Sequence, residues 1–303
     1  MASTKDLKKR IGTVKNTQQT TRAMKMVSAA KLRRAQEAIS NHRPYAKRVL
    51  GLIRHLASGM TFTTENQFPL LRVKGNEATA PKRVMLVVFT SDRGLCGGFN
   101  GNAIKNCLRW IQKHGNQCAS VEIGFVGRKG HDFFKTKKVK LGPYYHEISG
   151  KVTFAQATKL ADALVDRFVK GEVDEIKFVY SEFKNAVTQQ VVVEDFLPYV
   201  LDPSEVGQEG EKDRPKVTDY IVRPSKVEVL TELLAKNFAI QSFRVLLESQ
   251  AGEHGARMSA MENATKNAGE MIRKLTLQYN KQRQAGITKE LLEIISGSES
   301  QKG

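Results

Sequence analysis

Cysteine and aromatic residues are scarce in this sequence. Only 7% of the 303 residues are Phe, Trp or Tyr, and there is a single tryptophan. The cysteines, Cys96, Cys107 and Cys118, are odd in number and include no C-x-x-C pair, and the histidines show no ligand spacing around them. This excludes a disulfide scaffold and the common zinc sites. We therefore expect free thiols in a reducing compartment, and no bound metal.

Long apolar runs are also lacking. No stretch approaches the roughly 18 apolar residues that a membrane-spanning helix requires, and no apolar signal segment follows the first residues. The sequence therefore predicts a soluble protein or one that is peripheral to a membrane.

The signatures of catalysis are missing as well. There is no G-x-S-x-G, no H-E-x-x-H and no pair of carboxylates bracketed by core residues. Isolated histidines such as His131 and His146 are more often surface or core residues than bases. We expect no catalytic residue and no cofactor in this chain.

One stretch, TSDRGLCGGFNG at residues 90–101, at first suggests a phosphate-binding turn because it follows the apolar run VMLVVF. Its glycines are spaced by 3, 1 and 3 residues, which fits neither G-x-G-x-x-G nor G-x-x-x-x-G-K-[ST]. No acidic residue in 116–120 could hold a ribose. We interpret the stretch as a structural turn between strand and helix, in which glycine allows positive φ and close approach. Asp92 and Arg93 would form a local turn or surface pair.

Acidic residues are rare at the start of the chain, whereas basic residues are abundant. The whole chain has a net charge of +18, and residues 1–57 hold 14 Lys and Arg against only Asp6 and Glu37. Such a segment indicates an acidic partner, and one class that fits is a basic coiled-coil protein that binds nucleic acid. Against that class, Tyr45 is the only aromatic residue besides histidine in this segment, so stacking platforms for bases are missing.

The N-terminal segment has a helical 3-4 spacing of seam positions. These positions are Leu7, Ile11, Val14, Gln18, Thr21, Lys25, Ser28, Leu32, Ala35, Ile39, Ala46, Val49, Ile53 and Leu56. The seam is apolar at both ends and polar or small in its centre, so it needs a further surface around it. Pro44 is expected to kink or interrupt the helix, or to lie in the first turn of a new segment after Ser40 or Asn41.

The C-terminal segment continues the same spacing for longer. Its seam positions are Leu247, Ala251, His254, Met258, Met261, Thr265, Ala268, Ile272, Leu275 and Tyr279, followed loosely by Leu291 and Ile294. No proline follows Pro224, so residues 225–296 would form one helix of ~108 Å, which is longer than a compact domain. We expect this helix to pair with the N-terminal one as an antiparallel coiled coil. The alternative is a helical hairpin divided at Gly252 and Gly255.

Between the two helices the sequence alternates between strand and helix patterns. Predicted strands are 84–90, 121–126, 175–180 and 190–195, and predicted helices are 101–114 and 154–169. This pattern favours an open, mainly parallel sheet flanked by helices, that is, a Rossmann-like α/β domain. We divide the chain into an N-terminal helix at 1–57, an α/β foot at 58–224 with a surface loop at 202–216, and a C-terminal helix at 225–303.

Apolar side chains near the N-terminus do not all lie on the predicted seam. Met24, Met26 and Val27 lie side by side in the sequence, so some of them must face away from the partner helix. Apolar groups on an outer face surrounded by Arg and Lys are typical of a shaft held inside another protein.

Three motifs carry a resemblance to a known family. TTRAMKMVSAAKLRRAQ at 20–36, TSDRGLCGGFN at 90–100 and ITKELLEIISG at 287–297 resemble the gamma subunit of the F-type ATP synthase in order and spacing. The resemblance covers essentially the whole chain. Where the family usually has Gly-Ala, this chain has Gly297 and Ser298, and it lacks the cysteine-bearing insertion of plastid members, so thiol control is not expected.

The resemblance implies a non-catalytic rotor, present as one copy per complex. The coiled coil would stand inside a hexamer of alpha and beta subunits, and the α/β domain would form a foot with the epsilon subunit on the ring of c subunits. Proton flow would turn ring and shaft, and the asymmetric shaft would drive the beta sites through their states of ATP synthesis.

The resemblance also implies contact residues and a location. Met24 would meet the moving beta loops, and the cooperating positions on the C-terminal helix are Arg257, Gln284, Thr288 and Glu290. To these we add Arg283, whose guanidinium suits a carboxylate on the surrounding subunits. The expected location is peripheral, at the cytoplasmic face of a bacterial inner membrane, with no nucleic acid bound.

Overall fold

The computed structural model describes residues 3–58, 70–73, 81–148, 152–185, 189–201 and 222–300. By its internal contacts the chain divides into two compact units. One unit combines residues 1–30 with 257–303, and the other comprises residues 31–256. The loop expected at 202–216 lies outside the described residues.

Two long helices contribute to both units. Helix α1 spans Thr4–Ser58 and helix α5 spans Lys226–Ser300, which is 75 residues without a break. The alternative of a hairpin at Gly252 and Gly255 is therefore wrong. At Gly252 the helix passes so close to the sheet that a Cβ would lie 3.2 Å from the Ser181 hydroxyl oxygen. Packing at this point offsets the roughly 1 kcal/mol that a glycine costs inside a helix.

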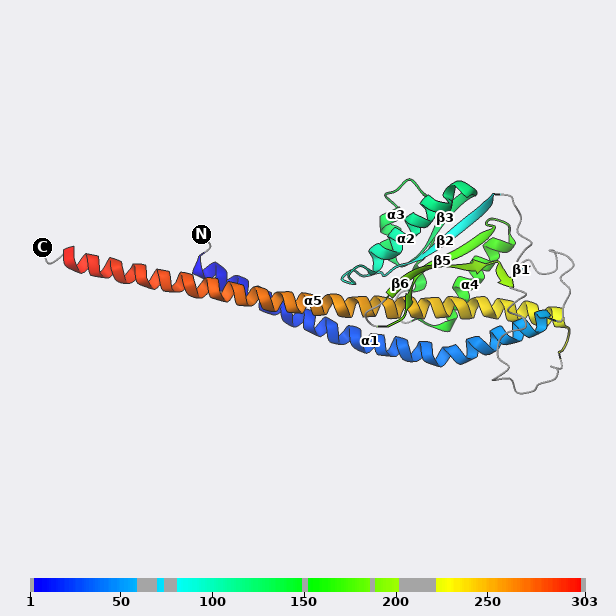
Figure 1. The fold of residues 1–303 in the computed structure, drawn as a ribbon, viewed down its shortest axis with the longest axis horizontal. Helices are drawn as coiled ribbons and strands as arrows, with labels where there is room; N and C mark the ends of the chain where they lie inside the picture. Colours follow the sequence, from blue (N-terminus) through cyan, green and yellow to red (C-terminus); the bar gives the residue numbers. More distant parts are fainter. Residues whose placement is uncertain are drawn as a thin grey trace. The chain divides into compact units, whose positions relative to one another are not determined.

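Pro44 lies inside α1, which continues beyond it to Ser58. The predicted interruption and the predicted restart after Ser40 or Asn41 are therefore wrong. The proline ring removes only one backbone donor, while the turns on either side are held by buried Ile39 and Val49. Figure 1 shows that the ribbon of α1 changes direction in its C-terminal third.

The larger unit is built on a five-stranded sheet. Its strands are β2 Lys82–Phe89, β3 Cys118–Val126, β4 Lys140–Tyr145, β5 Glu175–Phe183 and β6 Gln189–Leu197. They follow the order β4-β3-β2-β5-β6, and β6 alone pairs antiparallel. The predicted α/β domain with a mainly parallel sheet is confirmed. The sequence patterns did not predict β4, nor the pair of short strands β1 Leu71–Val73 and β7 Tyr199–Leu201.

Helices cover both faces of the sheet (Figure 1). Helices α2 Phe99–His114 and α3 Arg128–Phe134 pack on one face, and α4 Phe154–Val169 packs on the other with the flanking parts of α1 and α5. Along β2, Val84, Leu86 and Val88 point into the first core, whereas Met85, Val87 and Phe89 point into the second. This alternation explains why β2 is an unbroken apolar run, since a strand buried on both faces has no polar side. Two short 3-10 turns, η1 Gly115–Gln117 and η2 His146–Ile148, complete the unit.

Helix α5 is fixed to the sheet by a polar cluster. The Arg244 guanidinium donates to Glu194 at 2.5 Å and to the Tyr180 hydroxyl at 2.9 Å, and that hydroxyl donates to the second Glu194 oxygen at 2.5 Å. Burial, only partly offset by Arg244, raises the pKa of the nearby Glu248 carboxyl. The cluster bonds one side chain of α5 to two strands, β5 and β6.

A second polar cluster joins α4 to β3 and β4. Buried Glu122 accepts from Arg167 at 2.7 Å and pairs with Lys140 at 3.2 Å. Gly142 leaves room for this carboxylate, because a Cβ there would lie 2.6 Å from its oxygen. Burial alone would raise the pKa of Glu122, but the hydrogen bonds from Arg167 and Lys140 outweigh it and hold the pKa below its usual value.

We predict that Glu122→Gln lowers the free energy of unfolding near neutral pH by about 1–3 kcal/mol, because Arg167 loses a charged partner. Since the folded-state pKa lies below the unfolded value, the carboxylate stabilises the fold fully above its ordinary pKa of 4.5. This contribution is lost as the pH falls through the folded-state pKa. The difference between wild type and variant should therefore shrink in acid, which urea denaturation of the purified chain over a pH series measures.

The control is Glu172→Gln, which removes a half-exposed carboxylate bonded to the same Arg167 at 2.7 Å. Its effect should stay below about 1 kcal/mol. A difference between Glu122→Gln and wild type that is constant across the pH series would contradict the assigned pairing.

Candidate functional site

The glycine-rich turn after β2 is closed by its own side chains. Asn100 accepts from the Ser91 backbone N–H at 2.9 Å, and its amide nitrogen donates to the Ser91 hydroxyl at 2.8 Å and to the Cys96 sulfur at 3.2 Å. Gly97 has φ +56°, as the structural interpretation of the turn requires, and Leu95 also has a positive φ of +65°. The polar groups that would face a phosphate are thus bonded to one another.

The same turn is joined to the end of β3. The Asp92 carboxylate accepts from the Arg128 backbone N–H at 2.9 Å, at the start of α3. Gly127 has φ +96°, and a Cβ there would lie 1.9 Å from the Thr90 carbonyl oxygen. Only glycine fits this crossing, so the carboxyl ends of β2 and β3 form a rigid joint.

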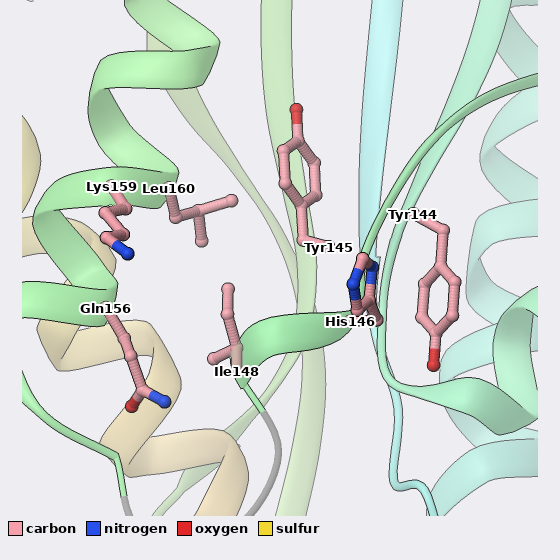
Figure 2. A pocket seen from close by; sticks show the side chains of 7 residues that line it. All are labelled: Tyr144, Tyr145, His146, Ile148, Gln156, Lys159 and Leu160. Atoms are coloured by element: carbon pink, nitrogen blue, oxygen red, sulfur yellow. The ribbon is translucent and has the colours of Figure 1, made fainter.

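A recess of about 200 Å³ lies between α4 and the segment that ends β4 (Figure 2). It is lined by Tyr144, Tyr145, His146, Ile148, Gln156, Lys159 and Leu160. In Figure 2, Lys159 and Gln156 extend from α4 on one side, and Tyr144 and His146 stand on the other. Among the described residues the Tyr145 hydroxyl has no hydrogen-bond partner, and burial raises its pKa to about 12. The residues that line this recess include no nucleophile activated by a base.

The thiols of Cys96 and Cys107 are buried, and all three cysteines are free. Burial raises the pKa of Cys107 to about 12, which keeps this thiol protonated and unreactive. Within the described ranges, no three His, Cys, Asp or Glu side chains converge to hold a metal ion. Nor does any helix in those ranges have the length and apolar character needed to cross a membrane.

The other unit is a pair of antiparallel helices, which we call the helix-end pair: residues 4–30 of α1 and 257–300 of α5. Cross-helix contacts join Gln18 and Thr21 to Thr265, and Lys25 to Glu262. Residues later in α1 therefore contact residues earlier in α5, so the two helices run antiparallel, as predicted. Buried Leu7, Met261 and Ala268 lie on this seam.

Two predicted contact residues are half-buried in the helix-end pair. Met24 is half-buried, and its carbonyl accepts from the Ser28 hydroxyl at 2.8 Å. Arg257 is also half-buried, at the start of the α5 part of this unit. Met26 and Val27 are 61% and 57% exposed, which confirms that some apolar side chains of this stretch face away from the partner helix.

The remaining predicted contact residues, Arg283, Gln284, Thr288 and Glu290, are exposed on the last turns of α5. The Thr288 hydroxyl donates to the Gln284 carbonyl at 3.0 Å. Arg283 lies 26 residues after Arg257, which is about 39 Å along the helix. The structure therefore places the predicted contact residues at two separate levels along the axis of the helix-end pair.

The last turns of α5 extend past the N-terminus of α1 (Figure 1). Exposed apolar side chains gather there, namely Ile287, Leu291, Leu292, Ile294 and Ile295. The expectation that the seam continues to Leu291 and Ile294 is wrong for contacts within the chain, because α1 begins at Thr4 and offers these residues no surface. We call residues 283–298 the α5 tip.

The polar contacts across the helix-end pair are not predicted by the sequence pattern. The Thr21 and Thr265 hydroxyls lie 2.8 Å apart, and Lys25 pairs with Glu262 at 2.6 Å. The available signal was the run of polar residues at seam positions of α1, but their partners depend on the register between two segments that are distant in sequence.

Comparisons with known proteins agree over the whole chain. A family model described as ATP synthase matches residues 3–300. The chain is 44% identical over 303 residues to the protein named ATP synthase gamma chain of Bdellovibrio bacteriovorus, and 46% identical over 303 residues to that of Geobacter metallireducens. Both alignments cover 100% of this chain and 100% of the relative.

Solved structures are similar to the fold. A chain in the central stalk and c-ring of the Tetrahymena thermophila mitochondrial ATP synthase matches with TM-score 0.57 and 25% identity, covering 81% of this chain and 99% of that chain. A chain of the Euglena gracilis mitochondrial ATP synthase in rotational state 3 matches with TM-score 0.63, covering 98% of this chain and 94% of that chain. At 18% identity, the latter shows the fold alone.

Proposed function

The chain belongs to the ATP synthase gamma-chain family and is a central-stalk rotor subunit of that complex, and we propose how its residues perform the coupling. The helix-end pair turns inside the ring of alpha and beta subunits, and it is this rotation that changes the nucleotide sites on beta. Proton flow through the c ring drives the rotation. The chain itself is non-catalytic.

The observation that carries this proposal is the outer surface of the helix-end pair. Met26 and Val27 are exposed on it, and the basic side chains of α1 surround them with few acidic residues. An isolated two-helix rod would gain nothing from exposed apolar groups. Inside a ring of acidic loops, by contrast, both features have partners.

The exposed charges suit a moving contact. Solvent-exposed ion pairs contribute about 0–1 kcal/mol each, so they can form and break as the shaft turns. A large, dry apolar interface would hold one rotary position. The polar and small residues in the centre of the seam also keep the rod thin.

The two levels of contact residues have different roles. Met24 and Arg257 meet the moving beta loops, and the α5 tip with Arg283, Gln284, Thr288 and Glu290 turns in the bearing formed by the surrounding subunits. The Arg283 guanidinium presents a planar set of donors that suits a carboxylate.

The larger unit forms the foot of the rotor. It binds the epsilon subunit and stands on the c ring, with one copy of the chain per complex. The subunit is a peripheral part of a membrane-bound complex. Because the relatives that are 44% and 46% identical come from the bacteria Bdellovibrio bacteriovorus and Geobacter metallireducens, we place it at the cytoplasmic face of the inner membrane.

A nucleic-acid-binding role for the basic coiled coil has no support. The full-length relatives are ATP synthase gamma chains. In addition, α1 contains only Tyr45 as a stacking ring besides its histidines, and base stacking contributes much of single-strand binding.

The direct test is affinity capture of the tagged chain from nuclease-treated, mildly solubilised membranes. We expect alpha, beta, epsilon and c subunits in the eluate, together with ATPase activity. Recovery of the chain alone, or with nucleic acid, would contradict the proposed function.

We predict that Met24→Lys leaves the complex assembled and lowers the number of protons pumped per ATP hydrolysed. The new ammonium would pair with a carboxylate on a beta loop and favour one rotary position. An ion pair of about 0.5 kcal/mol changes a rate about twofold, which proton pumping and ATP hydrolysis measured on the same vesicles resolve.

The matched control is Met24→Leu, which keeps an apolar side chain of similar size, adds no charge and should leave pumping per ATP hydrolysed unchanged. Normal pumping per ATP hydrolysed in the Met24→Lys complex would rule out the proposed role of this residue.

We predict that removal of residues 284–303 lowers the yield of assembled complex several-fold. The five exposed apolar side chains of the α5 tip would then be lost, and each contributes about 1 kcal/mol or more when it is buried against a partner. The yield is measured by quantifying alpha and beta captured per tagged chain. Removal of residues 297–303 alone, which keeps these side chains, should leave the yield unchanged; equal yields for both truncations would contradict the bearing role.

A further inference from the structure

In the centre of the helix-end pair, apolar packing cannot fix how far the two helices are shifted along each other. Seam positions in a 3-4 pattern recur about once per helical turn, so a slip of one turn again brings seam positions onto seam positions. The α1 seam here consists of Gln18, Thr21, Lys25 and Ser28, none of which is a large apolar side chain. The register of this stretch must therefore depend on other contacts.

One such contact runs from a side chain to the backbone of the other helix. The Gln18 amide nitrogen donates to the Thr265 carbonyl at 3.3 Å. It reaches this carbonyl over Gly269, where a Cβ would lie 3.0 Å from the amide nitrogen. A glycine one turn after Thr265 thus leaves space for this donor, and a slip by one turn would place an ordinary side chain there.

A second contact joins two hydroxyls. Thr21 and Thr265 lie 2.8 Å apart, and each hydroxyl also lies near a carbonyl of its own helix, Thr265 at 2.7 Å from Met261 and Thr21 at 3.0 Å from Gln18. Two hydroxyl hydrogens serve these three contacts. If both pointed to their own carbonyls, two oxygen atoms would face each other with no hydrogen between them. One hydrogen therefore bridges the helices, and the other connects the bridge to the backbone.

The neighbouring ion pair is a weaker determinant of register. Lys25 and Glu262 lie 2.6 Å apart, but their side chains are 37% and 57% exposed. Long, exposed side chains can re-form such a pair after a shift, and the gain is small. The hydroxyl bridge at 2.8 Å and the Gln18 amide contact at 3.3 Å are both part-buried, so a shift would leave them without partners.

We propose that Gln18, Thr21, Thr265 and Gly269 form a register lock, which fixes the axial position of α1 against α5. The lock determines which residue of α5 lies beside half-buried Met24. A slip of one helical turn would move that surface by about 5.4 Å. The place of the lock in coupling rests on the proposed function, whereas its effect on register does not.

The test is cross-linking in the assembled complex. Lys25→Cys with Glu262→Cys reports the native register, and Lys25→Cys with Lys266→Cys reports a shift of about one turn. A short bifunctional thiol reagent is applied, and the linked peptides are quantified by mass spectrometry. We expect the native pair to dominate when the lock is intact.

Removing the lock should raise the ratio of shifted to native product. For Thr21→Ala with Thr265→Ala we expect a rise of about fivefold, the effect of one net hydrogen bond on an equilibrium. Thr21→Ser with Thr265→Ser keeps both hydroxyls and should restore the wild-type ratio. The matched control is Thr20→Ala with Thr276→Ala, because these exposed hydroxyls donate to the Asn16 and Ile272 carbonyls of their own helices.

Gly269→Ala separates register from general stability. Alanine favours the helix over glycine, so a purely structural role predicts a tighter coiled coil and an unchanged ratio. The lock predicts a higher ratio, because the new Cβ displaces the Gln18 amide. This variant also keeps the test valid if the double alanine variant does not assemble.

Pumping per ATP hydrolysed is measured on the same complexes. An unchanged cross-linking ratio in both Gly269→Ala and the double alanine variant overturns the lock, whatever the coupling. A raised ratio with lower coupling supports the lock. A raised ratio with normal coupling also supports the lock, and counts instead against the proposed role of Met24.

Discussion

Helix α5 carries apolar side chains along most of its 75 residues, and these must be buried against other parts of the protein. The rest of the structure depends on which elements bury them. Residues in its first part, such as Leu230, Leu234 and Phe238, are buried in the core of the α/β unit. Further along, Met261 and Ala268 are buried in the helix-end pair. None of the described residues covers the α5 tip, so its apolar side chains are exposed and are available to the partners proposed above.

The larger unit holds its part of α5 by polar as well as apolar contacts. Arg244 bonds to Glu194 and Tyr180 on two strands, and Gly252 lets the helix approach the sheet closely. A part-buried network of this kind cannot shift gradually, because any displacement leaves charged groups unpaired. Helix α5 is therefore held rigidly against the sheet of the larger unit.

In the helix-end pair, a different set of contacts fixes the position of α1 along α5. Its seam is apolar near Leu7 and Tyr279 but polar around Thr21 and Thr265. The polar part contributes less stability through apolar packing. The polar stretch instead forms directional hydrogen bonds that fit one register only, as polar groups in coiled-coil seams do in general. A shaft that transmits torque needs a fixed shape more than it needs maximal stability.

The sequence by itself determined what depends on local periodicity. It predicted both long helices, the four main strands, the antiparallel pairing and the family, because apolar spacing and quoted motifs are readable within one segment. It did not determine β4, where Gly142 and Pro143 obscure the strand pattern, nor the seven-residue α3, nor the continuity of α1 through Pro44. Only the tertiary structure decided these, and it alone paired Thr21 with Thr265 and left the α5 tip uncovered. Such contacts join residues more than 200 positions apart, and their register follows from the packing of the whole chain, which no local pattern records.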